Sequence, residues 1–188
     1  MLMNKLDIFL QDSLLYIPIR KRILKNVILN YFKDYLNKLK DKTIFEIGCS
    51  NGHGSSLIKR YFSPKEIIAT DLDERLLNLA KRNIKDASIR FELADATKLR
   101  FRNNTFNAVF DFGVVHHIPD WENCLKELHR VLKPKGFVFI YDVSIESFNS
   151  LWGQIIKIFT LHPYESMYQK NEFTNYLNKL GFKILTDN

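Results

Sequence analysis

Short apolar runs alternate with longer stretches of mixed polarity along most of the chain. The runs that begin at Ile44 and Ile67 end in Gly48 and Asp71, and such runs are typical of buried strands in a parallel sheet. The stretches between the runs carry apolar residues at helical spacing. Strands that alternate with helices predict right-handed βαβ units and a parallel sheet.

This pattern defines the elements that we expect. The predicted strands are Ile44–Ile47, Ile67–Asp71, Ile89–Leu93, Phe106–Asp111, Phe137–Tyr141 and Gly181–Thr186. The predicted helices are an N-terminal helix with Ile23, Leu24, Val27, Ile28, Tyr31, Phe32 and Tyr35, a helix that begins near Gly54, and helices over Asp73–Asn83, Glu122–Leu132 and Asn171–Leu180. Loops or turns are expected over Phe112–Asp120 and Lys133–Gly136.

The turn after the first strand indicates a ligand site. Gly48 and Gly52 have no Cβ, so they can adopt φ > 0 and let a ligand approach the backbone. The helix that follows presents free N–H groups at its start. Asp71, at the tip of the second strand, is placed to accept hydrogen bonds from a ribose diol. These features predict a nucleoside site, although a strand-to-helix turn without a ligand is the alternative interpretation.

The spacing of the glycines separates two kinds of nucleoside. A dinucleotide fingerprint would need glycine at 48, 50 and 53, but Ser50 and His53 occupy two of these positions, which disfavours a nicotinamide oxidoreductase. The sequence has an acidic residue, Glu46, two positions before Gly48. This arrangement resembles motif I of the class I S-adenosylmethionine-dependent methyltransferases, with Ser50 in place of the middle glycine.

Two further motifs extend the resemblance from Thr43 to Val143. Phe106–Ile118 resembles the "FD-v-v-s...l-H-H-i" signature of the small-molecule, type 11-like branch, and Arg130–Gly136 is similar to its "R-v-L-k-P-G-G" helix exit. Asn107 and Lys135 depart from these patterns, at positions that are not expected to touch the methyl group. The resemblance implies a Rossmann-like, doubly wound, mostly parallel sheet with helices on both faces in three α/β/α layers, one strand short at the C-terminus.

The resemblance also implies roles for individual residues. Glu46 would interact with the ammonium group of S-adenosylmethionine, or stabilise the turn as its alternative role. Asp71 would accept from both ribose hydroxyls, and Asp95 from the adenine amine, unless Asp95 is an ordinary turn or cap residue. The backbone or carboxylate of Asp111 would hold the methionine end. The cofactor-binding residues implied in this way are Glu46, Gly48, Cys49, Ser50, Gly52, Asp71, Leu72, Asp95, Ala96, Asp111 and Phe112.

Three residues are catalytic candidates. His116 or His117 could act as a general base on a hydroxyl or amine nucleophile, and Asp111 lies at the end of the strand before them. The alternative is that a loop histidine packs beneath the cofactor, because alignment of a nucleophile with an activated sulfonium supplies much of the acceleration. No metal site is expected, since adjacent loop histidines point in different directions.

Composition fits one domain. The chain has 188 residues, 46% apolar and 13% aromatic, which is enough for a core on both faces of a sheet. Within a single domain, 1–188, we expect an N-terminal helical substrate cap over 1–40, a cofactor-binding core over 43–143, and a lid, last helix and last strand over 144–188. Neither a secretory signal nor a membrane span is expected, so a cytoplasmic location is predicted.

The net charge of +7 raises the question of an anionic partner. Lysine is abundant throughout, so a solvated surface is the preferred interpretation and nucleic acid is disfavoured, but not excluded. The cluster Arg20–Lys25 stands out, because cations at a helix start oppose the helix dipole. It is either a basic edge of a packed helix or a site for an anionic ligand.

The sequence therefore predicts an enzyme that transfers a methyl group from S-adenosylmethionine to a small molecule and releases S-adenosylhomocysteine. Aromatic residues between Ser144 and Lys170 suggest an apolar or aromatic acceptor. A non-catalytic cofactor-binding subunit and a methyltransferase of RNA or protein remain the alternatives. An exposed edge strand at the C-terminal side would invite pairing, with a second copy of the chain as one candidate.

Overall fold

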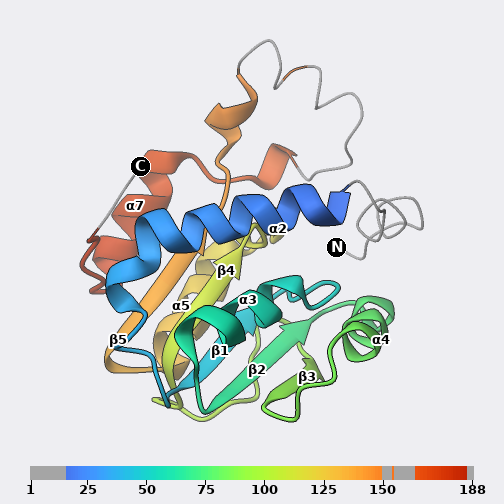
Figure 1. Cartoon of the computed structure of the whole chain (residues 1–188). Coiled ribbons are helices and arrows are strands. Elements are labelled where there is room, and N and C mark those ends of the chain that lie inside the picture. The colour runs from blue at the N-terminus through green and yellow to red at the C-terminus, as the bar shows by residue number, and fades with distance from the viewer. Residues whose placement is uncertain (1–15, 150–153, 155–163, 186–188) are drawn as a thin grey trace.

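The computed structural model of the protein describes residues 16–149, 154 and 164–185 (Figure 1). The strands are β1 (Thr43–Ile47), β2 (Glu66–Asp71), β3 (Ile89–Leu93), β4 (Phe106–Phe112) and β5 (Leu132–Tyr141). The helices are α2 (Tyr16–Val27), α3 (His53–Phe62), α4 (Glu74–Asn83), α5 (Trp121–Val131) and α7 (Lys170–Lys179). Shorter helical turns are η1 (Ile28–Phe32), η2 (Lys33–Tyr35), η3 (Val115–His117), η4 (Ile145–Phe148) and η5 (Tyr164–Ser166).

The five strands form one parallel sheet in the order β3-β2-β1-β4-β5. The chain builds outward from β1 to β3, then returns to place β4 on the other side of β1. The strand order therefore reverses between β1 and β4. In open α/β sheets, ligands bind beyond the carboxyl ends of the strands at this reversal, so the topology directs attention to the residues that follow Ile47 and Phe112.

Strand side chains alternate between two cores. Ile44 and Phe110 point to the face covered by α2, α3 and α4, together with Ile58 and Leu77 from these helices. Phe45, in contrast, packs on the face covered by α5 and α7, with the residues Val109, Leu125, Leu128, Phe173 and Tyr176. Both faces are buried, which is why the strands read as continuous apolar runs. The predicted three-layer α/β/α class is confirmed.

The N-terminal helix is shorter than predicted. At Ile28 it widens into the π-helical turn η1, and it ends in the 3₁₀ turn η2 at Tyr35. This change of pitch accompanies the packing of Phe32 against the rings of Phe110 and Phe139, at centroid distances of 6.3 and 4.8 Å. Tertiary contacts thus override the simple helical period that the sequence suggested. Residues 1–15, the first part of the predicted substrate cap, lie outside the described residues.

The strand β5 begins earlier than predicted and contains a bulge. Leu132 pairs with Phe106 and Phe137 pairs with Ala108, so residues 133–136 of β5 lie opposite the single residue Asn107 of β4. Lys135 has φ +65° there. Glycine adopts a positive φ more readily than lysine, which explains why the related motif has glycine at this position.

The predicted sixth strand over Gly181–Thr186 is wrong, because Gly181–Leu185, its described part, contains no strand. After α7, Gly181 turns the chain at φ +90°, and Phe182 N–H donates to Leu177 O at 3.0 Å. Phe182 then packs edge-on against His129 of α5, at 5.1 Å between ring centroids. This helix-ending turn directs the segment back to α5 instead of extending it beside β5.

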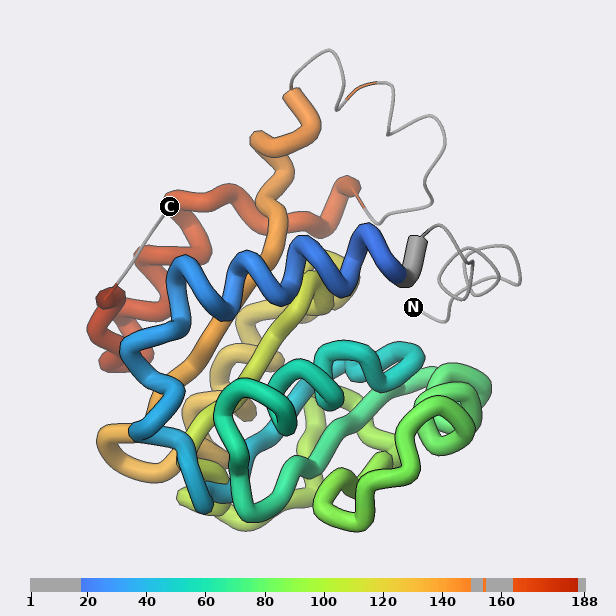
Figure 2. The backbone as a smooth tube through the Cα atoms, viewed as in Figure 1, coloured from blue at the N-terminus to red at the C-terminus, as the bar shows by residue number. Residues whose placement is uncertain are grey.

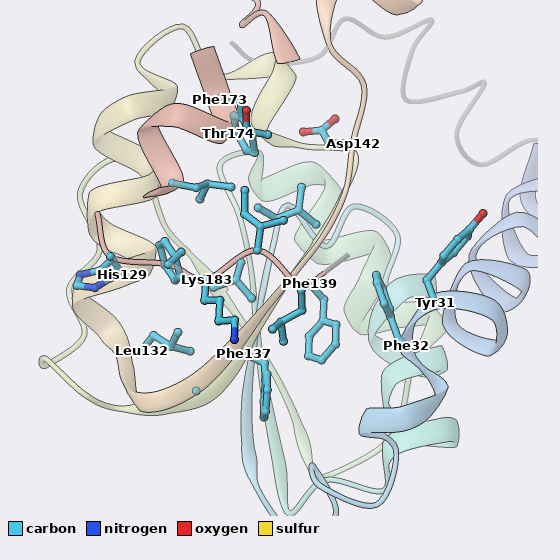
Figure 3. A pocket seen from close by; sticks show the side chains of 18 of the residues that line it. Tyr31, Phe32, His129, Leu132, Phe137, Phe139, Asp142, Phe173, Thr174 and Lys183 are labelled. Carbon is cyan, nitrogen blue, oxygen red and sulfur yellow. The ribbon is translucent and has the colours of Figure 1, made fainter. Parts of the chain in front are cut away.

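The outer edge of β5 consequently has no strand partner within the described part of the chain. A groove of about 1340 Å³ follows this edge, with η1 on one side and α7 on the other. Figure 2 traces these segments, in blue and red, near the orange strand. Figure 3 shows Phe137 and Phe139 along the groove and Asp142 at its upper end.

Candidate functional site

The glycine turn, residues 48–54, joins β1 to α3 at the point where the strand order reverses. Gly48, Ser50 and Gly52 all have positive φ, at 56°, 51° and 85°. A Cβ on Gly48 would overlap Val114 Cγ2 and lie 2.6 Å from Cγ1. Gly48 is thus required both by its dihedral angle and by its contact with the loop that follows β4.

Cys49 connects this turn to the neighbouring strand. Its N–H donates to Thr70 O at 2.8 Å, and its side chain is 3% exposed. Burial, together with the nearby carboxylates of Glu46 and Asp71, raises the pKa of the thiol. Cys49 is therefore a neutral packing residue whose backbone helps to shape the turn.

Glu46 lies beneath the glycine turn and is 2% exposed. Its Oε2 is hydrogen-bonded to Ser55 Oγ, and a Cβ on Gly54 would overlap its Oε1. Burial raises the pKa of Glu46 to about 8, while Ser55 and the positive charge of Arg20 oppose the increase. Glu46 accordingly holds a proton near neutral pH, and an added cation would favour its ionised form.

Arg20 comes from α2, far away in the sequence. Its Nη2 donates to the carbonyl oxygen of Phe112 at 3.1 Å, which fixes the guanidinium at the carboxyl end of β4. The same charge acts on Glu46 beneath the turn. In Figure 1, α2 crosses beside the arrowhead of β4, so its inward side covers the point where the strand order reverses.

Asp71 ends β2 and faces the glycine turn. Its Oδ2 accepts from Ser50 N at 2.9 Å, and its Oδ1 accepts from Asp73 N at 3.0 Å. Burial raises the pKa of Asp71, and the backbone N–H groups of Asp73, Ser50 and Leu72 oppose that change. A carboxylate has about four lone-pair sites, so Asp71 can accept a further hydrogen bond while it braces the turn.

Apolar side chains surround the ends of β2 and β3. Leu72 is 45% exposed and Leu93 is 61% exposed, and the residue before Leu72, Asp71, is paired in register with Leu93. Asp95 and Ala96 follow on the same edge. Asp95 Oδ1 accepts from Thr97 N at 2.8 Å and from Thr97 Oγ1 at 2.7 Å, which makes it a turn residue but leaves Oδ2 outside these two bonds. Two exposed leucines beside a carboxylate can accommodate a flat, partly polar ring.

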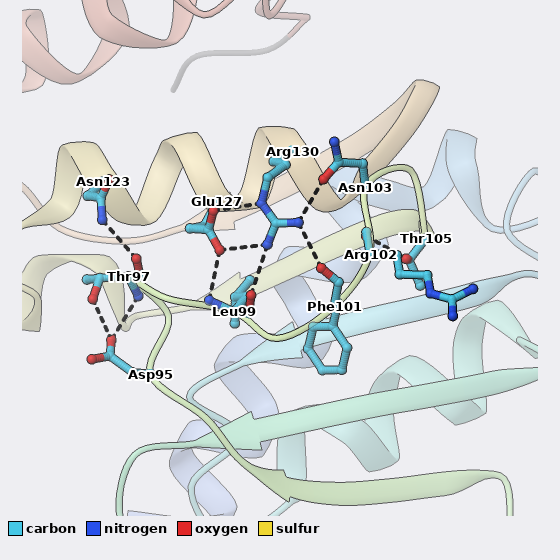
Figure 4. A network of polar contacts seen from close by, with 10 residues as sticks. All are labelled: Asp95, Thr97, Leu99, Phe101, Arg102, Asn103, Thr105, Asn123, Glu127 and Arg130. Atoms are coloured by element: carbon cyan, nitrogen blue, oxygen red, sulfur yellow. Dashed lines mark hydrogen bonds and ion pairs between the residues drawn. The ribbon is translucent and has the colours of Figure 1, made fainter.

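The segment that carries Asp95 is fixed to α5 by a polar network (Figure 4). Arg130 donates to the carbonyl oxygens of Leu99 and Phe101 at 2.9 and 2.7 Å. Glu127 pairs with Arg130 and accepts from Leu99 N at 2.8 Å. The arginine of the helix-exit motif therefore has a positioning role that its sequence context does not reveal.

A second group of polar side chains, which we call the carboxyl cluster, lies at the ends of β4 and β5. It consists of Asp111, His116, Asp142 and Tyr168. Asp111 is fully buried, and its Oδ1 accepts from Val114 N at 2.9 Å. Burial and the adjacent carboxylate of Asp142 raise the pKa of Asp111 well above its usual value. Asp111 is thus a carboxyl group beside Asp142 that is enclosed by the protein.

Asp142 connects the cluster to the predicted base. One oxygen of its carboxylate is hydrogen-bonded to His116 Nδ1, and the other accepts from the backbone N–H of His116 at 3.0 Å. Tyr168 also interacts with this carboxylate, which raises the pKa of the phenol together with its burial. A carboxylate acceptor favours the tautomer with the proton on Nδ1, so Nε2 is the basic nitrogen of His116.

The two predicted histidines are placed differently. His116 is 6% exposed and is held by Asp142, whereas His117 is only partly buried and stacks on His116 with 3.9 Å between ring centroids. Both belong to the turn η3, which the sequence analysis treated as a loop. The geometry favours His116 over His117 as an oriented base.

Sequence reasoning missed three residues of this region: Arg20, Asp142 and Tyr168. Arg20 was noticed only as part of a basic cluster. Asp142 directly follows the predicted fifth strand, so its position at a strand end was the available signal. Tyr168 was predicted only as one of the aromatic residues of the substrate lid, because only the packing of the segment before α7 brings it to Asp142.

The groove along β5 is separate from the glycine turn. Asp142 and Tyr168 line it, but none of Glu46, Gly48 and Asp71 does. Across residues 16–149, 154 and 164–185, no group of three or more His, Cys, Asp and Glu side chains could hold a metal ion. Over the same residues, no helix is both long enough and apolar enough to cross a membrane.

The residues at the glycine turn fit S-adenosylmethionine on physical grounds. Positive φ angles leave the backbone approachable, Asp71 has acceptor capacity for a diol, and the buried carboxyl of Glu46 can ionise beside an ammonium group. The charge of Arg20 is suited to a carboxylate. All four features lie on the carboxyl side of β1, β2 and β4.

Comparisons with known proteins identify relatives that are named as methyltransferases. A fatty-acid O-methyltransferase of Mycolicibacterium smegmatis is 33% identical over 103 residues, which cover 55% of this chain and 37% of that protein. A sterol 24-C-methyltransferase of Kluyveromyces lactis is 28% identical over 157 residues, or 77% of this chain and 41% of that protein. This chain thus spans about two fifths of these relatives.

Solved structures and family models extend the comparison. The crystal structure of the PH0226 protein from Pyrococcus horikoshii OT3 is similar with a TM-score of 0.61 and 26% identity, covering 75% of this chain and 65% of that one. The family model described as a methyltransferase domain matches residues 45–140, about half of the chain. The chain therefore belongs to the methyltransferase-domain family of class I S-adenosylmethionine-dependent methyltransferases.

Proposed function

We propose that this protein transfers a methyl group from S-adenosylmethionine to an apolar small molecule with a hydroxyl or amine nucleophile. The observation that carries this proposal is the pair of sites that meet where the strand order reverses. The glycine turn with Glu46 and Asp71 is suited to a nucleoside with a cationic amino-acid group. The His116–Asp142 pair beside it is suited to accept a proton.

The cofactor would be held by residues at the ends of β1, β2 and β4. Asp71 binds the ribose hydroxyls, Leu72 packs on the adenine, and Asp95 and the Ala96 N–H group bind its polar edge. Glu46 pairs with the ammonium group. Arg20, held at Phe112 O, pairs with the carboxylate of the methionine part. The bound cofactor supplies an electrophilic methyl group on a sulfonium.

The carboxyl cluster would prepare the nucleophile. His116 Nε2 takes a proton from the acceptor, while Asp142 holds the opposite ring nitrogen and stabilises the imidazolium. Asp111 and Tyr168 lie against the Asp142 carboxylate and help to position it. In this proposal Asp111 is a positioning residue and His117 supports the ring of His116 by stacking.

An apolar acceptor is supported by two observations. Tyr141 and Val143, on either side of Asp142, are 42% and 37% exposed at the carboxyl end of β5. The two relatives described above are named for fatty acids and sterols, which are both lipids. Trp152, Phe159 and His162, predicted to belong to the substrate lid, lie outside the described residues.

Titration calorimetry with two ligands tests the cofactor assignment. S-adenosylhomocysteine contains the methionine part, whereas adenosine lacks it. We expect Asp71→Asn to weaken both ligands by about tenfold to a hundredfold, because it removes charge-assisted hydrogen bonds. Arg20→Gln should weaken S-adenosylhomocysteine by a similar factor and leave adenosine unchanged.

Glu74→Gln, at an exposed position on α4, is the matched control and should change neither affinity. A folded wild-type protein that binds neither ligand would contradict the cofactor site. Methyl transfer to a panel of fatty acids and sterols then tests the reaction, with His116→Gln as the inactive variant. Binding without turnover on that panel would favour the non-catalytic subunit.

A further inference from the structure

The outward side of α2 combines cations with exposed aliphatic side chains. We call this surface the basic face, and it consists of Ile19, Lys21, Arg22, Ile23 and Lys25. Ile19 is 60% exposed and Ile23, one helical turn later, is 43% exposed. Lys21, Arg22 and Lys25 are exposed as well. From Tyr16 to Lys33 the sequence has five cations and neither Asp nor Glu.

The core does not need this face. The inward side of α2 is formed by Leu24, Val27 and Ile28, which are 2%, 5% and 0% exposed, and by Arg20, which reaches Phe112 O. The inward side of α2 therefore supplies both the core packing and Arg20, the candidate cofactor contact. Within the part of the chain that the structure describes, Ile19 and Ile23 remain exposed, and the clustered cations repel one another.

We infer that the basic face is a docking surface for an anionic lipid bilayer. Lysine and arginine near a membrane surface are attracted to anionic headgroups, and aliphatic side chains beside them can enter the boundary with the acyl chains. Charge complementarity thus identifies the partner, and the two isoleucines supply the apolar part of the contact. The helix lies on the surface and does not cross it.

A lipid surface fits this composition better than RNA does. Both partners would attract the cations, but RNA gains contacts from aromatic stacking and hydrogen bonds to bases and 2′-hydroxyls. The exposed side chains among the cations are aliphatic, at Ile19 and Ile23. Such side chains increase affinity for a bilayer because they leave water on binding, and they do little for a phosphate backbone.

Docking would also orient the candidate active site. Arg20 is on the inward side of the same helix, at the carboxyl end of β4. The bilayer would therefore lie on the far side of α2 from the glycine turn, within one helix diameter of it. An apolar acceptor could then reach the site from the membrane, although the docking itself depends neither on the cofactor nor on the identity of the acceptor.

Vesicle co-sedimentation tests the inference. The probes are vesicles of phosphatidylcholine mixed with phosphatidylglycerol, and vesicles of phosphatidylcholine alone. The wild-type protein should bind the anionic vesicles and bind the neutral ones far more weakly. The double variant Arg22→Gln, Lys25→Gln should reduce binding to anionic vesicles by about 25-fold, or about fivefold for each charge.

The matched control is the double variant Lys98→Gln, Lys126→Gln, which removes the same charge from exposed positions on the α5 side. It should retain nearly full binding. A third variant, Ile19→Ser with Ile23→Ser, should reduce vesicle binding by about tenfold without changing the charge. S-adenosylhomocysteine affinity reports folding in each variant, independently of the vesicles.

Three outcomes would overturn the inference. The first is that the wild-type protein binds neither kind of vesicle. The second is that the control variant loses as much binding as the variant of the basic face, which would mean that net charge alone is responsible. The third is binding to a single-stranded or duplex RNA that is unaffected by Ile19→Ser and Ile23→Ser, without vesicle binding, which would assign the cations to RNA.

Discussion

The glycine turn and the carboxyl cluster are neighbouring regions that are built in different ways. The glycine turn is one continuous segment, shaped by backbone dihedral angles and by contacts of Gly48 and Gly54 that leave no room for a Cβ. The carboxyl cluster takes side chains from β4, η3, the end of β5 and the segment before α7. The first is local in sequence and the second is not.

Because of this difference, the two regions are sensitive to different kinds of substitution. A local turn fails when its dihedral angles or its contacts are changed, because no other part of the chain can supply the same backbone path. A cluster of buried polar groups fails when one partner is lost, because the remaining groups are left without a hydrogen bond. The two regions meet at Val114, which packs on Gly48 while its N–H donates to Asp111.

The largest expected effect is that of Gly48→Ala compared with Gly113→Ala. Both glycines follow a central strand with positive φ, at 56° and 79°. The Cβ at 48 would overlap Val114, whereas at 113 the nearest atoms are His116 Cε1 at 3.8 Å and Tyr141 O at 4.0 Å. We expect Gly113→Ala to lower the free energy of unfolding by about 1 kcal/mol, and Gly48→Ala by about 3 kcal/mol.

Denaturant unfolding measures both variants, and a double-mutant cycle identifies the cause. If the contact with Val114 is responsible, the variant that combines Gly48→Ala with Val114→Ala should be less destabilised than the sum of the two changes. Strict additivity would show that the dihedral angle alone matters. Equal decreases in the free energy of unfolding for the substitutions at positions 48 and 113 would contradict the proposed difference between the two regions.

The next effect concerns Asp142→Asn in the carboxyl cluster. We expect kcat to fall by about a hundredfold, because the amide can no longer stabilise the imidazolium or fix the Nδ1 proton of His116. The affinity for S-adenosylhomocysteine should not change.

Asp120→Asn is the matched control, since Asp120 is an exposed carboxylate that caps α5. Turnover on the fatty-acid and sterol panel measures both variants, and the ¹⁵N shifts of His116 report its tautomer. A hundredfold loss of kcat with an unchanged tautomer of His116 would indicate that Asp142 is purely structural. Similar losses of kcat in both variants would contradict a special role for the His116–Asp142 pair.

The smallest effect is a pH dependence set by Glu46. Its pKa is raised from 4.5 to about 8 by burial, so the folded protein binds one proton more than the unfolded chain between these values. The stability from this group is complete below about pH 4.5 and is lost as the pH rises towards 8. The loss is at most about 1.4 kcal/mol per pH unit.

Glu46→Gln provides the comparison, because the amide resembles the protonated acid and does not titrate. Unfolding measured across this range should show a steeper decline for the wild type than for the variant. If the ammonium group of the cofactor ionises Glu46, calorimetry near pH 7 in buffers of different ionisation enthalpy should detect proton release that Glu46→Gln lacks. Parallel pH curves for the two proteins would contradict a protonated Glu46.

The sequence by itself determined the layers, the strand ends and the glycine turn. Periodicity sufficed for these features, because buried parallel strands and amphipathic helices have distinct repeats. The glycine turn could be predicted from the sequence, because Gly48, Gly52 and Asp71 lie at fixed spacing along one segment. The motif resemblance then led to the same family that the residues 45–140 match.

Only the tertiary structure determined which side chains form the carboxyl cluster, where Arg20 lies and which path the C-terminal segment takes. Asp142, His116 and Tyr168 meet because the sheet aligns strand ends and the chain returns to them, which no local pattern encodes. Gly181–Leu185 has strand-like residues, yet its helix-ending turn and the contact of Phe182 with α5 hold it away from β5. Local propensity yields to packing in such segments, because the buried contacts are stronger than the preference of a short run.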